Sequence, residues 1–444
     1  MSLSDFGLDR RFKGSSAGGL KAPRNAASTR RQISNFLHST AVLLATRMLL
    51  GPVAFIARKF FTLLHARFEV RPALVVFGSR AAREFSDNSM HLFRWCVDEE
   101  GLVIDPVWMT RSRRVRNELR AAGLPVLLFP GLSALRALST CGTIVVSHRI
   151  ADVCMLSAMM RRDLRVVHLG HGIPVKRFRA SLPEFSSDSL FLDELRALND
   201  RDAWFVSSSK FSAKFVAEAN MAPVDRCPAL GLPRNDSLVV RERSIRNVDL
   251  ETRPKRILLA PTWRKGQASA QCLPAWIDDD RLLGALTRAG VELWIRLHPK
   301  ASAFERSRLS SLQGRGWGFF ELPSSEYPDV NTELTRFDAL ISDYSSIIAD
   351  FMLLNRPIGI VVEPGGEAQR ERDEQLYYPE LVAENLPQLR GLEDVLAFVN
   401  QVGRGWFPIQ YDLLRNLLHE HSGSACERVA LHFGFVPMVP EDLV

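Results

Sequence analysis

Residues 73–77 read Ala-Leu-Val-Val-Phe, a short and continuously apolar run that begins two residues after Arg71. A run of this length with β-branched residues is typical of a strand that is buried on both faces of a sheet. Similar runs follow at 126–129, 143–146 and 166–167, and helix-like segments separate them. This alternation predicts an α/β domain with a doubly wound parallel sheet.

A second series of strand-like runs begins after a charged stretch at 241–256. It comprises residues 257–260, 292–296, 319–322, 339–341 and 358–362. We therefore expect two Rossmann-like domains that face a cleft. Ligands of such sheets bind beyond the carboxyl ends of the strands, so the chemistry is expected in that cleft. The predicted parts are a disordered basic tail at 1–32, membrane-associating amphipathic helices at 33–66, an N-terminal domain at 67–245, a C-terminal domain at 246–392, and closing helices at 393–444.

The composition of the 444 residues is that of a globular protein, with 46% hydrophobic and 24% charged side chains. Its six cysteines are scattered and form no C-x-x-C pair, so the sequence indicates neither a disulfide framework nor a zinc site. These features are typical of a reducing cytoplasm. The formal charge of +7 suits a partner that carries phosphate.

Residues 33–66 are rich in Leu, Val and Phe, but Arg and Lys interrupt the segment. Because no stretch of about 18 uncharged apolar residues occurs, the segment does not predict a membrane-spanning helix. Apolar bulk flanked by basic residues favours a helix that lies in the membrane interface. The alternative is a helix that packs on the protein's own core. No secretory signal is expected, because the first apolar run follows Arg30 and Arg31 and contains Arg47.

The first candidate site is the loop after the run at 166–167, where glycines flank His171, and Lys176 and Arg177 follow. An uncrowded imidazole can accept a proton from a hydroxyl nucleophile, while the neighbouring cations attract an anionic substrate. The alternative is a loop histidine that bonds a backbone carbonyl.

Two further candidates follow strands of the second series. Arg296 and His298 lie at the end of one strand, where clustered bases suit a pyrophosphate, although a solvated strand end has the same pattern. Ser345 and Ser346 precede a helical pattern and could bind an anion or simply cap the helix. Residues 278–280 (Asp-Asp-Asp) could bind a metal, but they are more typical of the first turn of a helix.

Six segments together resemble the CDP-glycerol glycerophosphotransferase family, whose members build teichoic-acid-type poly(alditol phosphate) chains. The segments are Ser86-Asp87-Asn88, His171-Gly172-Ile173-Pro174-Val175-Lys176, Gly231-Leu232-Pro233-Arg234-Asn235-Asp236, Ala260-Pro261-Thr262-Trp263-Arg264, Arg296-Leu297-His298-Pro299 and Ser342-Asp343-Tyr344-Ser345-Ser346. The resemblance spans approximately residues 70–430 and rests on their joint occurrence in this order.

The resemblance implies a GT-B type fold in which the N-terminal domain binds the acceptor and the C-terminal domain binds the nucleotide donor. It implies attack by an acceptor hydroxyl on the glycerol-bearing phosphorus of CDP-glycerol, with release of CMP. No metal or other cofactor is expected to be obligatory, because Arg296, His298 and a helix N-terminus supply positive charge where a metal would otherwise lie. The residues that the resemblance makes catalytic are His171, Arg296 and His298. The donor- or phosphate-binding residues would be Thr262, Arg264, Asp343, Ser345 and Ser346, and the acceptor-binding residues would be Asp87, Asn88, Lys176, Arg234, Asn235 and Asp236.

The resemblance also implies peripheral, monotopic attachment to the cytoplasmic face of the membrane, where a lipid-linked glycan or polymer acceptor lies. The expected partners are therefore the nucleotide-activated alditol, that acceptor and an anionic membrane surface, and a homo-oligomer is compatible with the sequence. Transfer from CDP-ribitol, a GT-B glycosyltransferase using a nucleotide sugar, and a non-catalytic membrane-surface protein remain alternatives. Nucleic acid is not an expected partner, because the basic residues are dispersed and no motif of that class occurs.

Overall fold

The computed structural model describes residues 59–437, except residues 60, 64, 155–159, 183–189, 246–252, 263–272, 299–300, 317, 363–375 and 406–410. The predicted basic tail and most of the segment at 33–66 therefore lie outside the described residues. At the end of that segment, Phe61 is 6% exposed and belongs to the apolar cluster of the first domain, whereas Leu63 is 70% exposed. Among the described residues, no helix combines the length and the apolar character needed to cross a membrane.

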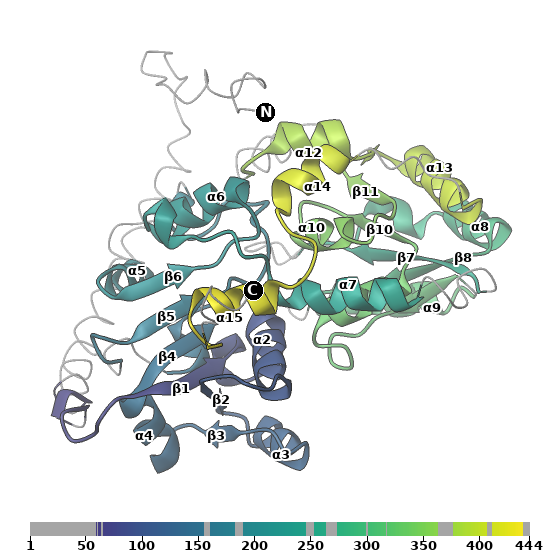
Figure 1. The fold of residues 1–444 in the computed structure, drawn as a ribbon. Coiled ribbons are helices and arrows are strands. Elements are labelled where there is room, and N and C mark those ends of the chain that lie inside the picture. The colour runs from purple at the N-terminus through teal and green to yellow at the C-terminus, as the bar shows by residue number, and fades with distance from the viewer. Residues whose placement is uncertain are drawn as a thin grey trace, which may run out of the picture. The chain divides into compact units, whose positions relative to one another are not determined.

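Six parallel strands form the first sheet (Figure 1), in the order β3-β2-β1-β4-β5-β6. They are β1 (Arg71–Gly78), β2 (Asp105–Thr110), β3 (Val126–Leu128), β4 (Cys141–Val146), β5 (Arg165–His168) and β6 (Asp202–Phe205). The order reverses between β1 and β4, where Val75 pairs with Thr143. Because parallel strands are buried on both faces, the continuous apolar run of β1 is what this position requires.

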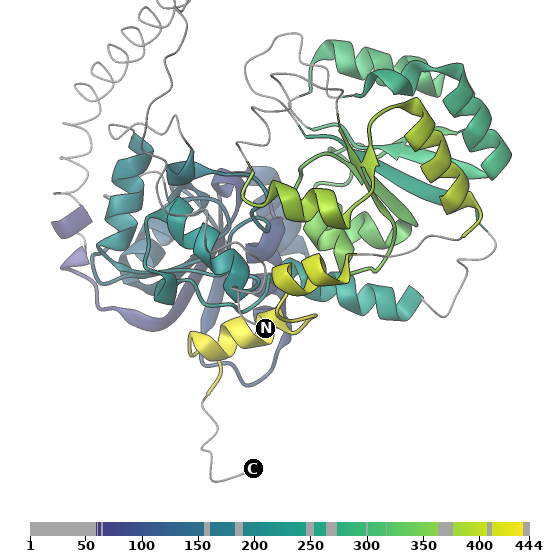
Figure 2. The same ribbon diagram turned by 90° about the horizontal axis from the view of Figure 1, so that it is seen from above.

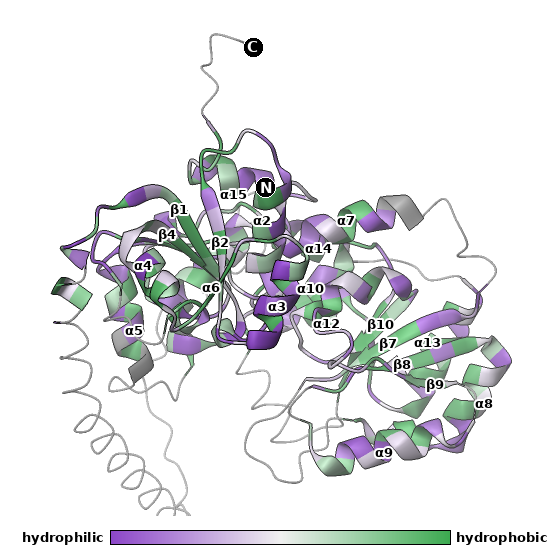
Figure 3. Cartoon of the chain, turned by 90° about the horizontal axis from the view of Figure 1, so that it is seen from below, coloured by the Kyte–Doolittle hydropathy of each residue, from purple (hydrophilic) through white to green (hydrophobic). Residues whose placement is uncertain are grey.

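Helices cover both faces of this sheet. They are α2 (Asp87–Asp98), α3 (Arg113–Ala121), α4 (Leu132–Thr140), α5 (Leu190–Asn199) and α6 (Lys210–Asn220). The next helix, α7 (Pro233–Ile245), contacts α2, and its Leu238 belongs to an apolar cluster with Leu258 and Leu340 of the second domain. Side chains alternate along β1, so Leu74 and Val76 pack with α4 and α6, whereas Val75 and Phe77 pack with α2 and α3. Figure 3 shows the resulting pattern, with apolar strands inside and a strongly polar α3 outside.

A second sheet of six parallel strands has the order β12-β11-β10-β7-β8-β9. Its strands are β7 (Lys255–Ala260), β8 (Val291–Ile295), β9 (Phe319–Glu321), β10 (Ala339–Ser342), β11 (Ile358–Val361) and β12 (Gln388–Leu389). Its helices are α8 (Asp280–Ala289), α9 (Ala303–Gln313), α10 (Ile347–Met352), α12 (Pro379–Asn385) and α13 (Leu392–Gly403). Ile257 and Leu259 pack with α8 and α13, and Leu258 packs with α10 on the opposite face. Here too the order reverses, between β7 and β10.

The last two helices, α14 (Asp412–Leu418) and α15 (Ala425–His432), connect elements of both domains (Figure 2). α14 contacts α6, α10 and α12, and α15 contacts α2 and α7. Short 3-10 helices occupy several loops, namely η3 (Arg80–Ala82), η4 (Ile150–Asp152), η6 (Arg179–Ser181), η7 (Val224–Arg226), η8 (Ala275–Asp278) and η9 (Val330–Arg336).

The prediction of two parallel-sheet Rossmann-like domains is confirmed. The sequence analysis did not identify β2, β6 and β12, because a proline, an aspartate or a length of two residues hides the apolar pattern there. The prediction that residues 278–280 start a helix is also confirmed, since Asp279 caps α8 by accepting a hydrogen bond from the Arg281 N–H.

Candidate active site

Two adjoining cavities lie where the carboxyl ends of the two sheets meet. The first, the cleft cavity, has a volume of about 550 Å³, and its lining includes Arg80, Asp87, Arg234, Arg296 and His298. The second, the loop cavity, has a volume of about 490 Å³, and its lining includes Ile173, Val175, Phe178, Val216 and Leu232. Five residues line both cavities, namely His171, Lys176, Thr262, Ser345 and Ser346. These five come from the carboxyl ends of β5, β7 and β10, as expected for the ligand site of such sheets.

Glycines shape the loop that carries His171. Gly170 has a φ of 68°, a left-handed conformation that glycine adopts without strain. A Cβ on Gly172 would lie 2.7 Å from the Ser346 Oγ and 2.9 Å from the Ser346 Cβ. The missing side chain therefore allows the second domain to approach the His171 loop closely.

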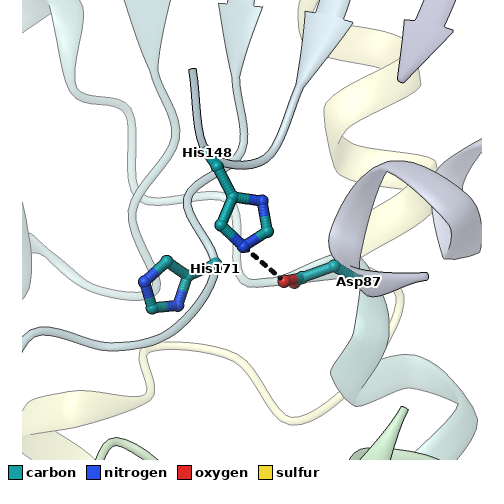
Figure 4. Close-up of side chains that lie close together, drawn as sticks. All are labelled: Asp87, His148 and His171. Carbon is teal, nitrogen blue, oxygen red and sulfur yellow. Dashed lines mark ion pairs between the residues drawn. The ribbon is translucent and has the colours of Figure 1, made fainter. Parts of the chain in front are cut away.

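His171 belongs to a cluster with His148 and Asp87 (Figure 4). The rings of His148 and His171 stack with centroids 4.8 Å apart and planes inclined by 19°. The His148 Nε2 lies 3.3 Å from the Asp87 Oδ2, and its Nδ1 lies 3.6 Å from the Asp152 Oδ2. The Asp152 carboxylate in turn accepts backbone N–H groups of Ser147 and His148, which fixes it at the end of β4. His148 thus lies between two anchored carboxylates, and one face of its ring covers His171.

Arg234, at the start of α7, ties this cluster to the second domain. Its Nη1 lies 3.4 Å from the Asp87 Oδ1, its Nη2 lies 2.5 Å from the Asp350 Oδ2, and it also donates to the His171 carbonyl. Burial alone would raise the pKa of Asp87, but the charges of Arg234 and His148 lower it below its usual value. Burial raises the pKa of Asp350, and Arg234 opposes that rise. Asp87 is therefore held as an anion beside the two histidines.

The surroundings of His171 favour its neutral form. Its side chain is exposed to solvent, but both domains crowd it. The resulting loss of hydration, with the charges of His148 and Arg234, lowers its pKa, and the Asp87 carboxylate opposes that shift. A neutral imidazole at physiological pH can accept a proton, which is what a general base requires.

Arg296 provides positive charge on the opposite wall of the cleft cavity. Burial lowers its pKa, and its Nη1 is buried without a hydrogen-bond acceptor among the described residues. The residue is half-buried, and a buried donor atom without an acceptor is costly unless a ligand accepts its hydrogen bond, which an anion does best. His298, Ser345 and Ser346 line the same cavity, so these three predicted residues lie where an anionic group would meet Arg296.

Lys176, Thr262 and Asp343 form a chain of contacts between the domains. The Lys176 Nζ donates to the Thr262 Oγ1 over 3.0 Å, and the Thr262 hydroxyl donates to Asp343. The Asp343 carboxylate also accepts the Thr262 N–H over 3.0 Å. Lys176, predicted to bind the acceptor, therefore reaches the loop predicted to bind the donor, and Asp343 holds that loop. Arg264 lies outside the described residues.

Three predicted acceptor-binding residues hold the framework together and are absent from the described lining of both cavities. Asn88 donates to the Gly170 carbonyl and accepts the Arg234 N–H, over 2.9 and 3.0 Å. Asn235 is buried and accepts a hydrogen bond from Asn331. Both carboxylate oxygens of Asp236 accept backbone N–H groups at the start of α15, from Ala425 and Cys426 at 2.8 Å.

The sequence analysis missed His148, Arg80 and Asp350. A signal for His148 was present, because it follows the apolar run at 143–146 just as His171 follows the run at 166–167. Arg80 follows β1 in the same way. Asp350 could not be identified, since only the fold brings α10 against Arg234.

Asp87, His148 and His171 are the described residues whose potential ligand atoms lie within 4.8 Å of one another, a spacing that could accommodate a metal. However, ring nitrogen lone pairs lie in the ring planes, and two nearly parallel rings do not direct them to one point. Asp87 is also paired with Arg234. This geometry favours proton transfer. At residues 278–280, Asp278 pairs with Arg308 and Asp280 with Arg315, while Asp279 caps α8.

Comparisons with known proteins identify a family and a fold. The sequence model of the CDP-glycerol:poly(glycerophosphate) glycerophosphotransferases matches residues 59–384. The teichoic acid poly(glycerol phosphate) polymerase of Bacillus spizizenii is 23% identical over 341 residues, which cover 74% of this chain and 83% of that protein. The teichoic acid poly(ribitol-phosphate) polymerase of the same organism is 30% identical over 181 residues, 39% of this chain and 28% of that protein.

A further relative, the teichoic acid poly(glycerol phosphate) polymerase of Staphylococcus epidermidis, is 27% identical over 201 residues, 42% of this chain. The match spans only 27% of that protein's length. Among solved structures, the wall teichoic acid polymerase TagF superposes with a TM-score of 0.66 at 18% identity, covering 90% of this chain and 97% of TagF. The structural likeness establishes the fold.

Proposed function

Because the chain belongs to the CDP-glycerol:poly(glycerophosphate) glycerophosphotransferase family, we propose that it transfers glycerol phosphate from CDP-glycerol to a hydroxyl of a membrane-linked acceptor. CMP is the second product, and the polymer is of the teichoic-acid or capsular type. The observation that carries the proposal is the position of His171. It lines both cavities, and the half-buried Arg296, whose Nη1 has no acceptor among the described residues, lines one of them.

In this proposal, residues of the first domain activate the acceptor, and residues of the second domain bind the pyrophosphate of the donor. The acceptor hydroxyl enters from the loop cavity, and His171 takes its proton as the oxygen attacks the glycerol-bearing phosphorus. The bond from that phosphorus to the bridging oxygen breaks, and CMP leaves with the electron pair. Arg296, His298 and the hydroxyls of Ser345 and Ser346 offset the charge that develops on the pyrophosphate. Asp87 stabilises the protonated form of His171, and the stacked ring of His148 holds the imidazole in place.

The donor assignment is tested by calorimetry with CDP-glycerol and Arg296→Ala. Loss of the Arg296 guanidinium should weaken donor binding at least tenfold, the usual order for a charged hydrogen bond. Arg288→Ala, on the surface of α8, is the matched control and should bind as the unaltered protein does. Equal affinity of all three proteins would place the pyrophosphate elsewhere.

CDP-ribitol remains the second candidate donor, since the 30% identity is to a poly(ribitol-phosphate) polymerase. CMP release measured in parallel with CDP-glycerol, CDP-ribitol and a panel of UDP- and GDP-sugars separates the alternatives. If only a nucleotide sugar supports activity, the enzyme is a glycosyltransferase and the proposed phosphate transfer is wrong.

The site of action in this proposal is the cytoplasmic face of the membrane, because the acceptor is lipid-linked. The basic, apolar segment at 33–66 would hold the enzyme there peripherally. CDP-glycerol is the donor substrate, and no metal is needed in this mechanism. Activity that disappears with EDTA and returns with Mg²⁺ would contradict it.

A further inference from the structure

A strained turn follows β1 at the edge of the cleft cavity. Its three residues, Arg80, Ala81 and Ala82, have φ values of 48°, 56° and 59°. None of them is glycine, and other L-residues adopt this left-handed region only at a steric cost. Strain of this kind persists where neighbouring groups fix the backbone, and it is concentrated at functional sites. The turn therefore indicates a role for the one side chain of the three that lines the cleft cavity, which is Arg80.

One buried carboxylate holds the turn in place. The Asp152 Oδ1 accepts the Ala81 N–H over 2.8 Å, and the Asp152 Oδ2 accepts the His148 N–H over 2.7 Å. The ring of His148 in turn stacks on the ring of His171. The same carboxylate therefore fixes the backbone of Arg80 relative to the proposed base.

The guanidinium of Arg80 can accept a ligand without losing a protein hydrogen bond. Its side chain is 49% exposed, and the two carboxylates beside it, of Glu84 and Asp87, both lie 3.9 Å away. That distance is too long for a hydrogen bond, and a half-exposed ion pair of this length contributes little to stability. Within the part of the chain that the structure describes, the Arg80 side chain has these two ion pairs and no hydrogen bond.

Arg80 lies close to both groups that the proposed function assigns to the reaction. Arg80, His171 and Arg296 all line the cleft cavity. Burial is the main cause of the lowered pKa of His171 and of Arg296, and the charge of Arg80 contributes to both shifts. Such charge effects weaken with distance, so Arg80 lies near both residues. In the proposed reaction the attacked phosphorus lies between the base His171 and the pyrophosphate at Arg296.

We propose that Arg80 donates hydrogen bonds to the nonbridging oxygens of the glycerol-bearing phosphate and stabilises their negative charge during transfer. This inference rests on the proposed function and deepens it by assigning a further catalytic residue. The acceptor oxygen bonds to that phosphorus, its proton passes to His171, and the bond to the bridging oxygen breaks with its electron pair leaving on CMP. Arg80 takes no part in the proton transfer. Its planar guanidinium can donate to two oxygens at once, and donors aimed at developing charge lower the barrier.

Kinetics and donor binding of Arg80→Ala test the proposal. CMP release at saturating CDP-glycerol gives kcat, with a glycerol phosphate trimer or a lipid-linked poly(glycerol phosphate) in vesicles as acceptor, and calorimetry gives the donor Kd. We expect kcat to fall by about tenfold or more, with partial recovery in Arg80→Lys, while Kd changes by less than about threefold. Unaltered kcat in Arg80→Ala, or weaker donor binding without a fall in kcat, would overturn the inference.

Arg83→Ala is the matched control for loss of an arginine at this turn. Arg83 directly follows the turn, is exposed, and is absent from the described lining of both cavities. It should leave kcat and Kd unaltered, and thermal melts verify that all variants fold. An equal fall in kcat in Arg83→Ala would show that general charge at the turn, and not a contact of Arg80, supports the reaction.

Sulfur substitution distinguishes a direct contact from a structural role. The probe is CDP-glycerol with sulfur in place of one nonbridging oxygen on the glycerol-bearing phosphorus, measured as each of its two diastereomers. Sulfur is a weaker acceptor, so loss of the Arg80 contact should reduce the rate ratio between the oxygen and sulfur donors for at least one diastereomer. If this ratio is the same in the unaltered protein, Arg80→Ala and Arg83→Ala for both diastereomers, Arg80 does not contact the phosphate.

Failure of the proposed function can be distinguished from failure of this inference. If the unaltered chain binds no CDP-glycerol, or releases no CMP with either acceptor, the proposed function is wrong and the inference falls with it. If the unaltered chain does both and Arg80→Ala equals it, the inference alone is wrong.

Discussion

His171 is the residue on which the proposed chemistry depends most directly. A positioned general base contributes about 100-fold or more to turnover, so His171→Ala should lower kcat by that order. Its side chain is exposed and its loop is held by backbone contacts, so the melting temperature should remain close to that of the unaltered protein. His421→Ala is the control for loss of an imidazole outside both cavities. Unaltered turnover by His171→Ala would remove His171 from the mechanism.

The pH dependence of the reaction follows from the lowered pKa of His171. A base acts in its neutral form, so activity falls as pH decreases through its pKa. Because loss of hydration, His148 and Arg234 lower that pKa, the acid limb of kcat/KM should lie below pH 6.5, the ordinary value for histidine. In Asp87→Asn the opposing carboxylate is lost, and the limb should move to still lower pH. A limb at or above 6.5 would indicate that another group titrates.

Among single residues, the sequence predicted the site from polar side chains that follow strands. His171, Arg296, His298, Ser345 and Ser346 were predicted in this way, and all five line the cleft cavity. The sequence could not distinguish a polar side chain that faces a ligand from one that holds a loop. Asn88 and Asp236 illustrate this, because both lie near the site but form hydrogen bonds to backbone groups of neighbouring loops. Arg234 does both, since it lines the cleft cavity and binds two carboxylates.

At the level of secondary-structure elements, we can test whether activity requires the close approach between the His171 loop and the start of α10. Gly172→Ala would place its Cβ 2.7 Å from the Ser346 Oγ, a distance at which one element must move. Since both elements line the site, we expect kcat/KM to fall at least tenfold, because small misplacements of reacting groups are costly. Gly391→Ala is the control, as its added Cβ meets nothing within 4 Å. Full activity of Gly172→Ala would show that the loops separate freely.

A buried histidine links the segment after α14 to α10. The His419 Nε2 lies 2.7 Å from the Ala349 carbonyl, and burial lowers the pKa of His419 to about 4. The unfolded chain binds this proton near pH 6.5, whereas the folded chain does not. Stability is therefore lost as pH falls from 6.5 towards 4, by about 1.4 kcal/mol per pH unit for this group. Urea unfolding at pH 7 and pH 5 should show a smaller decrease in His419→Gln, and an equal decrease would exclude His419 as a source.

The elements themselves were predictable to different degrees. Long apolar runs such as 73–77 identified their strands, because both faces of a parallel sheet are buried. β2 and β6 begin with aspartate and carry tryptophan or proline, so their strand character depends on pairing with β1 and β5. Pairing across 30 or more residues is tertiary information that a local pattern does not contain.

At the scale of the whole molecule, the two domains form one compact unit from residue 57 to 444. The sequence predicted two sheets and a ligand site at their carboxyl ends, because sheets of this topology bind ligands there. It did not predict that the site would divide into a cleft cavity and a loop cavity of different chemistry. That division depends on side-chain contacts, since Arg179 donates to Asn220 and to the His148 carbonyl, whereas the Arg296 Nη1 has no acceptor among the described residues.

The last prediction concerns attachment to membranes. The chain before residue 57 contains many basic residues and the apolar part of 33–66, and we propose that it binds an anionic bilayer surface. Each basic residue near such a surface adds about 1 kcal/mol of attraction, which salt weakens, whereas apolar burial persists. Because Phe61 packs in the core of the first domain, the informative deletion removes residues 1–56 and retains Phe61.

Cosedimentation with liposomes of anionic or neutral lipid is the measurement. The full chain should bind anionic liposomes, lose part of that binding at high salt, and bind neutral liposomes weakly. The truncated chain should stay in the supernatant and still release CMP with a soluble acceptor, while working poorly on a lipid-linked acceptor in vesicles. If both forms bind anionic liposomes equally, residues 1–56 do not provide the attachment, and a surface of the two-domain unit must do so.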